Sequence, residues 1–542
     1  MAYVKPGVEI TQVQRTFSPT LIAPDLIPVL VAPAYKVVPL DGADAYSYPK
    51  YSAGMTVTIS GLTSSMKLDA TSLHVDLVMT SGTNYGARLH IEPTQVTGAS
   101  DGGTTFVIPS GVASAASWSG ATVYVGYRAL NYSEGLQGFM TFESSEDIDN
   151  KFGGGQVVPE NPLPLAIYLA MSNTASSVNA VAMRYDEYAT LGSGASSAST
   201  ESTRCLDILA ANEVYAIAPM TIDSTAMAAY RSHADNLSTA IEKRERIVFL
   251  SPKITWYDQN SQSVSDPSTA DKAVTSRAVR DYSAAVGLKR TFHVFPDVAY
   301  MQDNQRQIQK IKPSYINNLY GFTATETAVL AKTYTLDSGK VYKAGTAVTD
   351  LVYTDLFNNA SIYKYDVYVP VPGFMLPASI VGQIAGQNPE QGHTNLPIAG
   401  PSKLKYSNEF FSESNLNTIA TGGNYIMTSV GGIISSRHQL STDMTSIERR
   451  ELNITKSVDF TAKYIRNTVS GYIGRSLITP AFLQLLGTII SGLGNTLVKE
   501  GRLNGFKVTG IKQDEVQRDV VRVSIEIQPK YPVNYIKVDL IF

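Results

Sequence analysis

The sequence is poor in cysteine and in charge. Cys205 is the single cysteine among 542 residues, which excludes an internal disulfide framework and a cysteine-based zinc cluster. We expect Cys205 to be a small buried apolar side chain. Only 17% of the residues are charged, with 44 basic against 47 acidic side chains. A chain so close to neutral has no long-range field that attracts polyanions, so we expect no direct contact with nucleic acid.

Recognisable catalytic motifs are lacking as well. The six histidines lie far apart, and none has a second histidine at helical spacing, which excludes a zinc-protease signature. The sequence has neither a phosphate-binding loop nor a Gly-x-Ser-x-Gly nucleophile motif. We therefore predict no catalytic residue, no metal site and no cofactor. An active site assembled from scattered residues would escape this search, so an enzyme remains an alternative interpretation.

Two uncharged segments, residues 161–183 and 476–498, have about the length that crosses a bilayer. The first contains prolines and asparagines, and the second contains Gln484, Asn495 and three glycines with its apolar residues in a stripe. We expect both segments to pack on protein, without membrane insertion. Residues 1–10 have no apolar core, so we expect no signal peptide and folding in a bacterial cytoplasm.

The composition changes along the chain, whose length requires several cores. Residues 1–34 contain five prolines and predict an extended N-terminal arm. Residues 35–135 alternate short apolar runs with turns and predict an inserted all-β domain, a sandwich or a barrel. Residues 136–375 alternate helical and strand patterns, which predicts a middle α/β domain. Residues 376–528 predict a C-terminal α/β domain, followed by a strand arm over residues 529–542. The predicted fold class is therefore α+β with several domains.

Local signals are most legible in the C-terminal part. Apolar residues at helical spacing predict one long amphipathic helix from Ile447 to Tyr472. A second helix follows, with Thr479 as its N-cap, Pro480 in its first turn and Gly501 after its end. The predicted apolar stripe of this second helix is Phe482, Leu486, Ile489, Leu493 and Leu497. Strands are then predicted over residues 505–511, 520–528 and 535–542.

Both ends of the chain carry strand-like alternation. The alternating positions are Val8, Glu9 and Ile10 near the N-terminus and Ile536, Val538, Leu540 and Phe542 at the C-terminus. A terminal strand presents unpaired backbone groups, which proteins normally cover. The pattern leaves two outcomes open: the ends pair inside their own fold, or they add to a sheet of a neighbouring molecule.

A series of segments occurs in a recognisable order and spacing. These are Pro6-Gly7-Val8, Pro377-Ala378-Ser379-Ile380-Val381-Gly382, Ile433-Ile434-Ser435-Ser436-Arg437, Glu448-Arg449-Arg450 and Gly501-Arg502-Leu503-Asn504-Gly505-Phe506. The series resembles the contractile tail sheath proteins of tailed phages and, more distantly, those of R-type pyocins and type VI secretion. Leu477-Ile478-Thr479-Pro480 departs from the glycine, acid and proline turn of that family. Residues 35–135 have no counterpart in the resemblance and look like an outward insertion.

The resemblance implies a structural subunit, not an enzyme, that polymerises helically around an inner tube and contracts to drive it through the host envelope. It implies that the terminal strands named above are exchanged between subunits. Such main-chain pairing persists while subunits rotate, so contraction needs no nucleotide.

The implied partners are further copies of the chain in stacked rings, the inner tail tube protein, and the baseplate and tail terminator proteins. Lys499, Arg502 and Lys507 are the candidates for contact with the tube. Their alternative interpretation is that of ordinary cations near the C-terminus of a helix. The implied location is the tail of the virion, after assembly in the cytoplasm of the host bacterium.

One further class of function stays open at this stage. A surface or adhesin-like binding protein would use the β domain, residues 35–135, to hold a ligand. The lack of an export signal disfavours this alternative.

Overall fold

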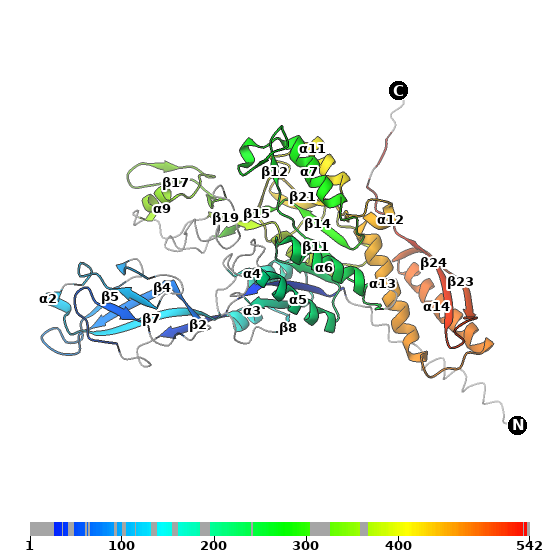
Figure 1. The fold of residues 1–542 in the computed structure, drawn as a ribbon, viewed down its shortest axis with the longest axis horizontal. Helices are drawn as coiled ribbons and strands as arrows, with labels where there is room; N and C mark the ends of the chain where they lie inside the picture. The colour runs from blue at the N-terminus through cyan, green and yellow to red at the C-terminus, as the bar shows by residue number, and fades with distance from the viewer. Residues whose placement is uncertain are drawn as a thin grey trace.

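The computed structural model describes most of the chain. It leaves undescribed residues 1–25, 35, 42–47, 60–61, 63–65, 92–94, 100–103, 114, 132–137, 154–160, 185–195, 240–241, 304–325, 358–366, 535 and 539–542. Figure 1 shows an elongated molecule with a β-rich part at one end, a central α/β body, and a helical and hairpin unit at the other end.

The central body is built on one eight-stranded sheet. In spatial order its strands are β22 (Ile433–His438), β21 (Asn424–Val430), β14 (Thr291–Phe295), β11 (Ile247–Leu250), β10 (Ala216–Pro219), β1 (Pro28–Ala34), β9 (Val178–Arg184) and β8 (Phe139–Phe142). The inner strands run parallel, and the two edge strands are antiparallel to their neighbours. Strands β1, β10, β11 and β14 are buried throughout. Such continuous apolar runs are typical of parallel strands covered on both faces.

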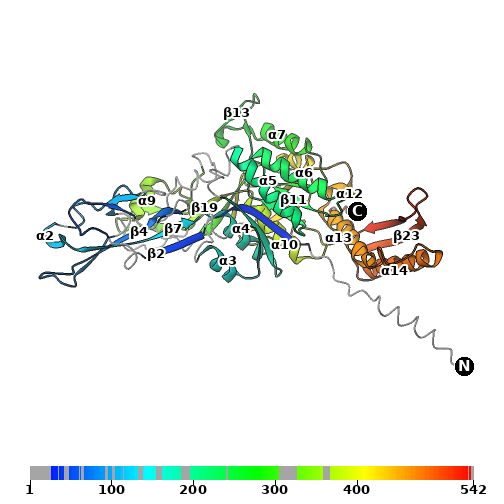
Figure 2. The ribbon, with the colours of Figure 1, turned by 60° about the horizontal axis from the view of Figure 1, so that its bottom comes forward.

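Helices cover both faces of this sheet. In Figure 2, α5 (Ser196–Ala211) and α6 (Ser224–Leu237) lie on one side of it, and α4 (Pro162–Met171) and α10 (Met375–Gly386) lie on the other. Helices α4 and α10 also pack against each other and against β1. Their contact is close because α10 presents Gly382 to the backbone of Ala170, where a Cβ would collide with the carbonyl oxygen. Helices α3 (Ser145–Phe152), α7 (Lys272–Ala284) and α11 (Glu413–Thr421) complete the body.

The strand pairing in the body differs from two of the domain boundaries predicted from the sequence. The predicted arm, residues 1–34, is too long, because β1 lies in the middle of the sheet between β10 and β9. The predicted boundary at residue 376 does not separate two cores either. Strand β21 pairs with β14, and one apolar core extends from Leu26 to Leu452. Both errors concern strand pairing between distant segments, which local composition does not encode.

The β-rich part is inserted between β1 and β8 and has an apolar core of its own. Four strands form one antiparallel sheet, in the order β2 (Lys36–Asp41), β7 (Thr122–Asn131), β4 (Met66–Val78) and β5 (Arg88–Ile91). Strands β3 (Thr56–Thr58) and β6 (Thr105–Val107) form a small second sheet, and α2 (Ala115–Trp118) is a single turn. In Figure 1 this part projects from the body.

Smaller elements decorate the body near residues 256–405. A four-stranded sheet has the order β16 (Val329–Leu330), β19 (Val367–Pro372), β15 (Val298–Asp303) and β20 (Lys403–Lys405). Two short hairpins are β12 (Trp256–Tyr257) with β13 (Ser263–Val264) and β17 (Tyr334–Thr335) with β18 (Val341–Tyr342). The short helices are η3 (Pro267–Thr269) and α9 (Asp350–Phe357).

The C-terminal unit consists of α12 (Ile447–Arg450), α13 (Leu452–Val469), η5 (Ser470–Tyr472), α14 (Pro480–Lys499), β23 (Leu503–Gln513) and β24 (Val521–Pro529). The single helix predicted over Ile447–Tyr472 is therefore interrupted. Glu451 has an extended backbone and occupies the N-cap position of α13 without a side-chain capping hydrogen bond. Its side chain is buried in a polar cluster. A periodic pattern does not reveal such a break, because the apolar face continues across it.

Candidate assembly surface

Helix α14 begins and ends where the sequence predicts. The Thr479 side chain accepts a hydrogen bond from the backbone N–H of Phe482 at 3.2 Å, and Pro480 opens the first turn. Gly501 follows the helix with a φ of 74°, the left-handed conformation that favours glycine. One face of the helix is buried, although Ile490 rather than the predicted Ile489 forms part of it.

The buried face of α14 packs on the hairpin β23–β24 and on α13. The core of this unit is Phe460, Tyr464, Leu493, Leu497 and Leu503. Phe506 of β23 packs directly over Gly494, where any Cβ would overlap the ring. The glycine therefore allows the hairpin to approach the helix closely.

The opposite face of α14 is open. Leu485 is exposed, as are Leu477 and Ile473 in the segment before the helix. Among the described residues α14 is the one helix whose length and mean hydropathy, 1.5, would allow a membrane span. In this structure the Thr479 side chain caps the helix, and one face of the helix packs on protein.

Strands β23 and β24 form a long antiparallel hairpin that no third described strand extends. The register runs from Leu503 opposite Pro529 to Gln513 opposite Val521. In β24 half-buried apolar side chains alternate with exposed polar ones. The hairpin packs on α14 through β23, whereas β24 contacts α13. Both outer edges therefore lack a pairing partner within the described part of the chain. Natural proteins usually cover long unpaired strand edges.

The hairpin turn is held by Asp514. Its Oδ1 accepts hydrogen bonds from the backbone N–H groups of Val516 at 2.8 Å and Gln517 at 2.9 Å, and its Oδ2 pairs with Arg522. These hydrogen bonds lower the pKa of Asp514 to about 2, and the bond from the Gln517 N–H contributes most. The carboxylate thus stays ionised at neutral pH and keeps the turn closed.

The C-terminal tail, which we define as residues 530–538, forms no strand on its own subunit where it is described. Ile536 and Val538 are 81% and 72% exposed. In Figure 1 the tail leaves the C-terminal unit and points away from the body. Leu540 and Phe542 lie outside the described residues, as do Val8, Glu9 and Ile10. The described positions of the predicted strand therefore have exposed apolar side chains and no intramolecular strand partner.

Of the three predicted tube-contact residues, Lys499 ends α14, Arg502 lies in the turn that follows, and Lys507 lies in β23. Lys499 and Lys507 are exposed. Arg502 is engaged within the subunit, since its Nε donates to Glu500 at 3.0 Å and its guanidinium lies 5.0 Å from the Phe460 ring centre. Lys499 lies in the last turn of α14, so the helix-end interpretation fits it as well as a contact with the tube does.

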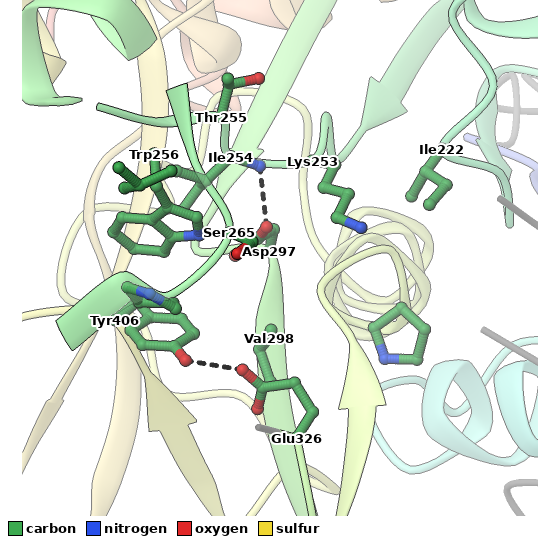
Figure 3. Close-up of a pocket in the computed structure, with 13 residues that line it drawn as sticks. Ile222, Lys253, Ile254, Thr255, Trp256, Ser265, Asp297, Val298, Glu326 and Tyr406 are labelled. Atoms are coloured by element: carbon green, nitrogen blue, oxygen red, sulfur yellow. Dashed lines mark hydrogen bonds between the residues drawn. The ribbon is translucent and has the colours of Figure 1, made fainter. Parts of the chain in front are cut away.

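A second candidate site is a cavity of about 300 Å³ beside the main sheet. Ile222, Lys253 and Asp297 line it, and each closely follows the carboxyl end of one of the neighbouring strands β10, β11 and β14. This edge of a parallel sheet is where α/β folds commonly bind ligands. Figure 3 shows Asp297 near the centre, with Trp256 and Tyr406 on one side and Lys253 on the other.

The acidic groups of this cavity are already held by the protein. Glu326 accepts hydrogen bonds from Lys405 at 2.8 Å and from the Tyr406 hydroxyl at 2.6 Å. Asp297 Oδ2 accepts from the Ile254 N–H at 2.8 Å, whereas Oδ1 is buried without a partner among the described residues. Burial raises the pKa of Asp297 to about 7. Because Oδ1 is buried, the cavity offers no open carboxylate oxygen there, and we assign no ligand to it.

Other expectations concern single groups. Cys205 is buried and unpaired by disulfide, as the sequence predicts, and burial raises the pKa of its thiol to about 12. Within the part of the chain that the structure describes, no three His, Cys, Asp or Glu side chains are grouped so as to hold a metal ion.

Part of the chain is similar in sequence to a known protein. No protein-family profile matches the chain. A tail sheath protein of Mycobacterium phage Bxz1 is 30% identical to it over 143 residues. The chain resembles tail sheath proteins. The match covers 26% of this chain and 24% of the relative's length, so the chain spans about a quarter of the tail sheath protein that it matches.

Several solved structures of sheath proteins are also similar to this chain, at low sequence identity. The contracted helical sheath of the anti-feeding prophage has a TM-score of 0.46 at 10% identity, over 76% of this chain and 89% of that chain. The contracted sheath complex of the extracellular contractile injection system PVC has a TM-score of 0.45 at 10% identity, over 74% and 86%. The sheath tail protein of Desulfitobacterium hafniense has a TM-score of 0.40 at 9% identity, over 93% and 94%.

Proposed function

We propose that this protein is a structural subunit of a contractile tail sheath and not an enzyme. The observation that carries the proposal is the hairpin β23–β24, whose two long edges are unpaired among the described residues, on the same unit as an exposed tail. The partial identity to a phage tail sheath protein supports it.

In this proposal, the open edges of the hairpin receive strands from other copies. The last strand of the C-terminal arm, residues 535–542, supplies Ile536, Val538, Leu540 and Phe542, and the N-terminal arm supplies Val8, Glu9 and Ile10. An added strand contributes main-chain hydrogen bonds worth about 0.5–1.5 kcal/mol each, and its alternate side chains extend the apolar face over α14. A strand of six to eight residues therefore links two subunits by several kcal/mol.

Contraction then consists of rotation of the bodies about persistent strand links. The subunits form a helical sheath of stacked rings around an inner tail tube protein, with baseplate and tail terminator proteins at its ends. Lys499, Arg502 and Lys507 contact the tube through weak, reversible charge interactions. The β-rich insertion, for which we keep the range 35–135, points outward. The protein is a component of the virion tail, assembled in the host cytoplasm.

The test is polymerisation of purified protein, followed by negative-stain electron microscopy. The unmodified chain is expected to form hollow cylinders, and deletion of residues 535–542 is expected to abolish them while circular dichroism stays unchanged. A subtler variant, Ile536→Asp with Val538→Asp, should act like the deletion. Lys537→Ala, on the opposite face of the same strand, should leave polymerisation intact. Long tubes from the truncated chain would contradict strand exchange.

A further inference from the structure

The chain between β24 and the C-terminal arm passes over the start of α13 and is held there by side chains. Asn453 Nδ2 donates a hydrogen bond to the carbonyl oxygen of Lys530 at 3.0 Å. The Tyr531 hydroxyl donates to Glu448 Oε1 at 3.1 Å. These contacts join two segments that are about eighty residues apart in sequence.

A third contact goes to a fully buried carboxylate. Asn534 Nδ2 donates to Glu451 Oε1 at 3.0 Å, and Glu451 is 0% exposed. The same carboxylate accepts from His438 at 2.9 Å and from Gln439 at 3.3 Å. Burial alone would raise the pKa of Glu451, but its hydrogen-bond donors, His438 first, hold the pKa below its usual value. Asn534 is therefore tied to an ionised group that the body itself fixes in place.

Among the described residues, Asn534 is the last one of the chain that makes such a contact. Beyond Asn534 the described side chains, Ile536 and Val538, are exposed. Eight residues follow Asn534, and at about 3.3 Å per extended residue they reach about 26 Å. Without these contacts the free chain would start at Pro529 and reach about 43 Å.

We propose that Glu448, Glu451 and Asn453 form a tail clamp that fixes the origin and direction of the C-terminal arm and aims it at another copy of the chain. This inference rests on the proposed strand exchange, and it names the residues that position the exchanged strand. A shorter free arm has a higher effective concentration at its target, which falls roughly as the −3/2 power of length. Release of the clamp lowers this concentration about twofold through length alone. It also allows the arm to turn back onto the open edges of its own hairpin.

The test uses the full chain with Tyr531→Phe and Asn534→Ala. These changes remove two clamp hydrogen bonds made by the tail and leave the hydrogen bonds of His438 and Gln439 to Glu451 in place. Val533→Ala is the matched control, since Val533 is an exposed tail residue with no polar side-chain atom. In the monomer, limited trypsin digestion with mass spectrometry compares cleavage after Lys530, inside the clamp, with cleavage after Lys537, beyond it.

The double variant is expected to be cleaved several-fold faster after Lys530 and at an unchanged rate after Lys537. Its critical concentration for tube formation should rise at least twofold, and Val533→Ala should match the unmodified chain in both assays. An unchanged rate after Lys530 overturns the clamp, and faster cleavage with unchanged assembly overturns its role in aiming the arm. If the unmodified chain forms no tubes, the proposed function fails, while the digestion still decides whether the clamp exists.

Discussion

A buried ion pair joins the body to the C-terminal unit. Arg290, just before β14, donates from both terminal nitrogens to Asp459 of α13, at 2.7 and 2.8 Å. Their side chains are 14% and 3% exposed, and the buried Tyr215 hydroxyl donates to the same carboxylate at 3.0 Å. Burial alone would lower the pKa of Arg290, but the adjacent carboxylate outweighs burial and raises it. The Arg290 guanidinium is therefore charged in the folded protein.

We expect Asp459→Asn to weaken this joint strongly. The variant keeps the shape of the side chain but leaves the Arg290 guanidinium buried without a counter-charge, which typically costs about 3–5 kcal/mol. If exchange follows the opening equilibrium, the amides of α13 should exchange with solvent roughly a hundredfold to a few thousandfold faster. Hydrogen exchange with mass spectrometry is the suitable assay, because a protein with several cores need not unfold in one step.

Two further variants show whether the charge pair is the cause. Replacing both partners, Arg290→Met with Asp459→Leu, removes the unpaired charge and should recover most of the loss. Arg280→Ala is the matched control, since Arg280 and Asp281 form a pair at the same 2.8 Å distance but on the exposed surface. Exposed pairs are worth about 0–1 kcal/mol, so α13 exchange should barely change. If Asp459→Asn has no larger effect than Arg280→Ala, the buried pair does not hold the joint.

Two other predictions concern the body. Gly382→Ala forces a methyl group against the backbone of Ala170 and should destabilise the body by about 1–3 kcal/mol, measured as a lower urea midpoint, and an unchanged midpoint would refute the close contact. Asp297 has a folded pKa of about 7, above its unfolded value of about 3.9, so the folded state binds more protons between these values and stability falls as pH rises from about 4 to about 7. Asp297→Asn should flatten this pH dependence in thermal unfolding, and an equal slope in both proteins would show that Asp297 is not its source.

Helix α14 could be predicted almost completely, because its signals are local. Thr479, Pro480 and Gly501 act on the groups within one turn of them, whatever the rest of the fold does. The resemblance to sheath proteins could likewise be recognised from the order and spacing of short segments. The match to a phage tail sheath protein supports it for part of the chain. The tail clamp could not be predicted from the sequence. Glu448 and Glu451 near a helix start are an ordinary pattern, and nothing local indicates that Tyr531 and Asn534 reach them.

The sequence alone determined that amphipathic helices follow one another in the C-terminal part, where α14 is capped, and that both termini have strand-like alternation. These properties depend on side-chain spacing and on hydrogen bonds between near neighbours. Only the tertiary structure decided that β1 occupies the middle of the sheet, that β21 pairs with β14, and that α13 begins at a buried Glu451. Those outcomes come from contacts between residues far apart in the chain. Their stability depends on which surfaces are buried together, so no single segment encodes them.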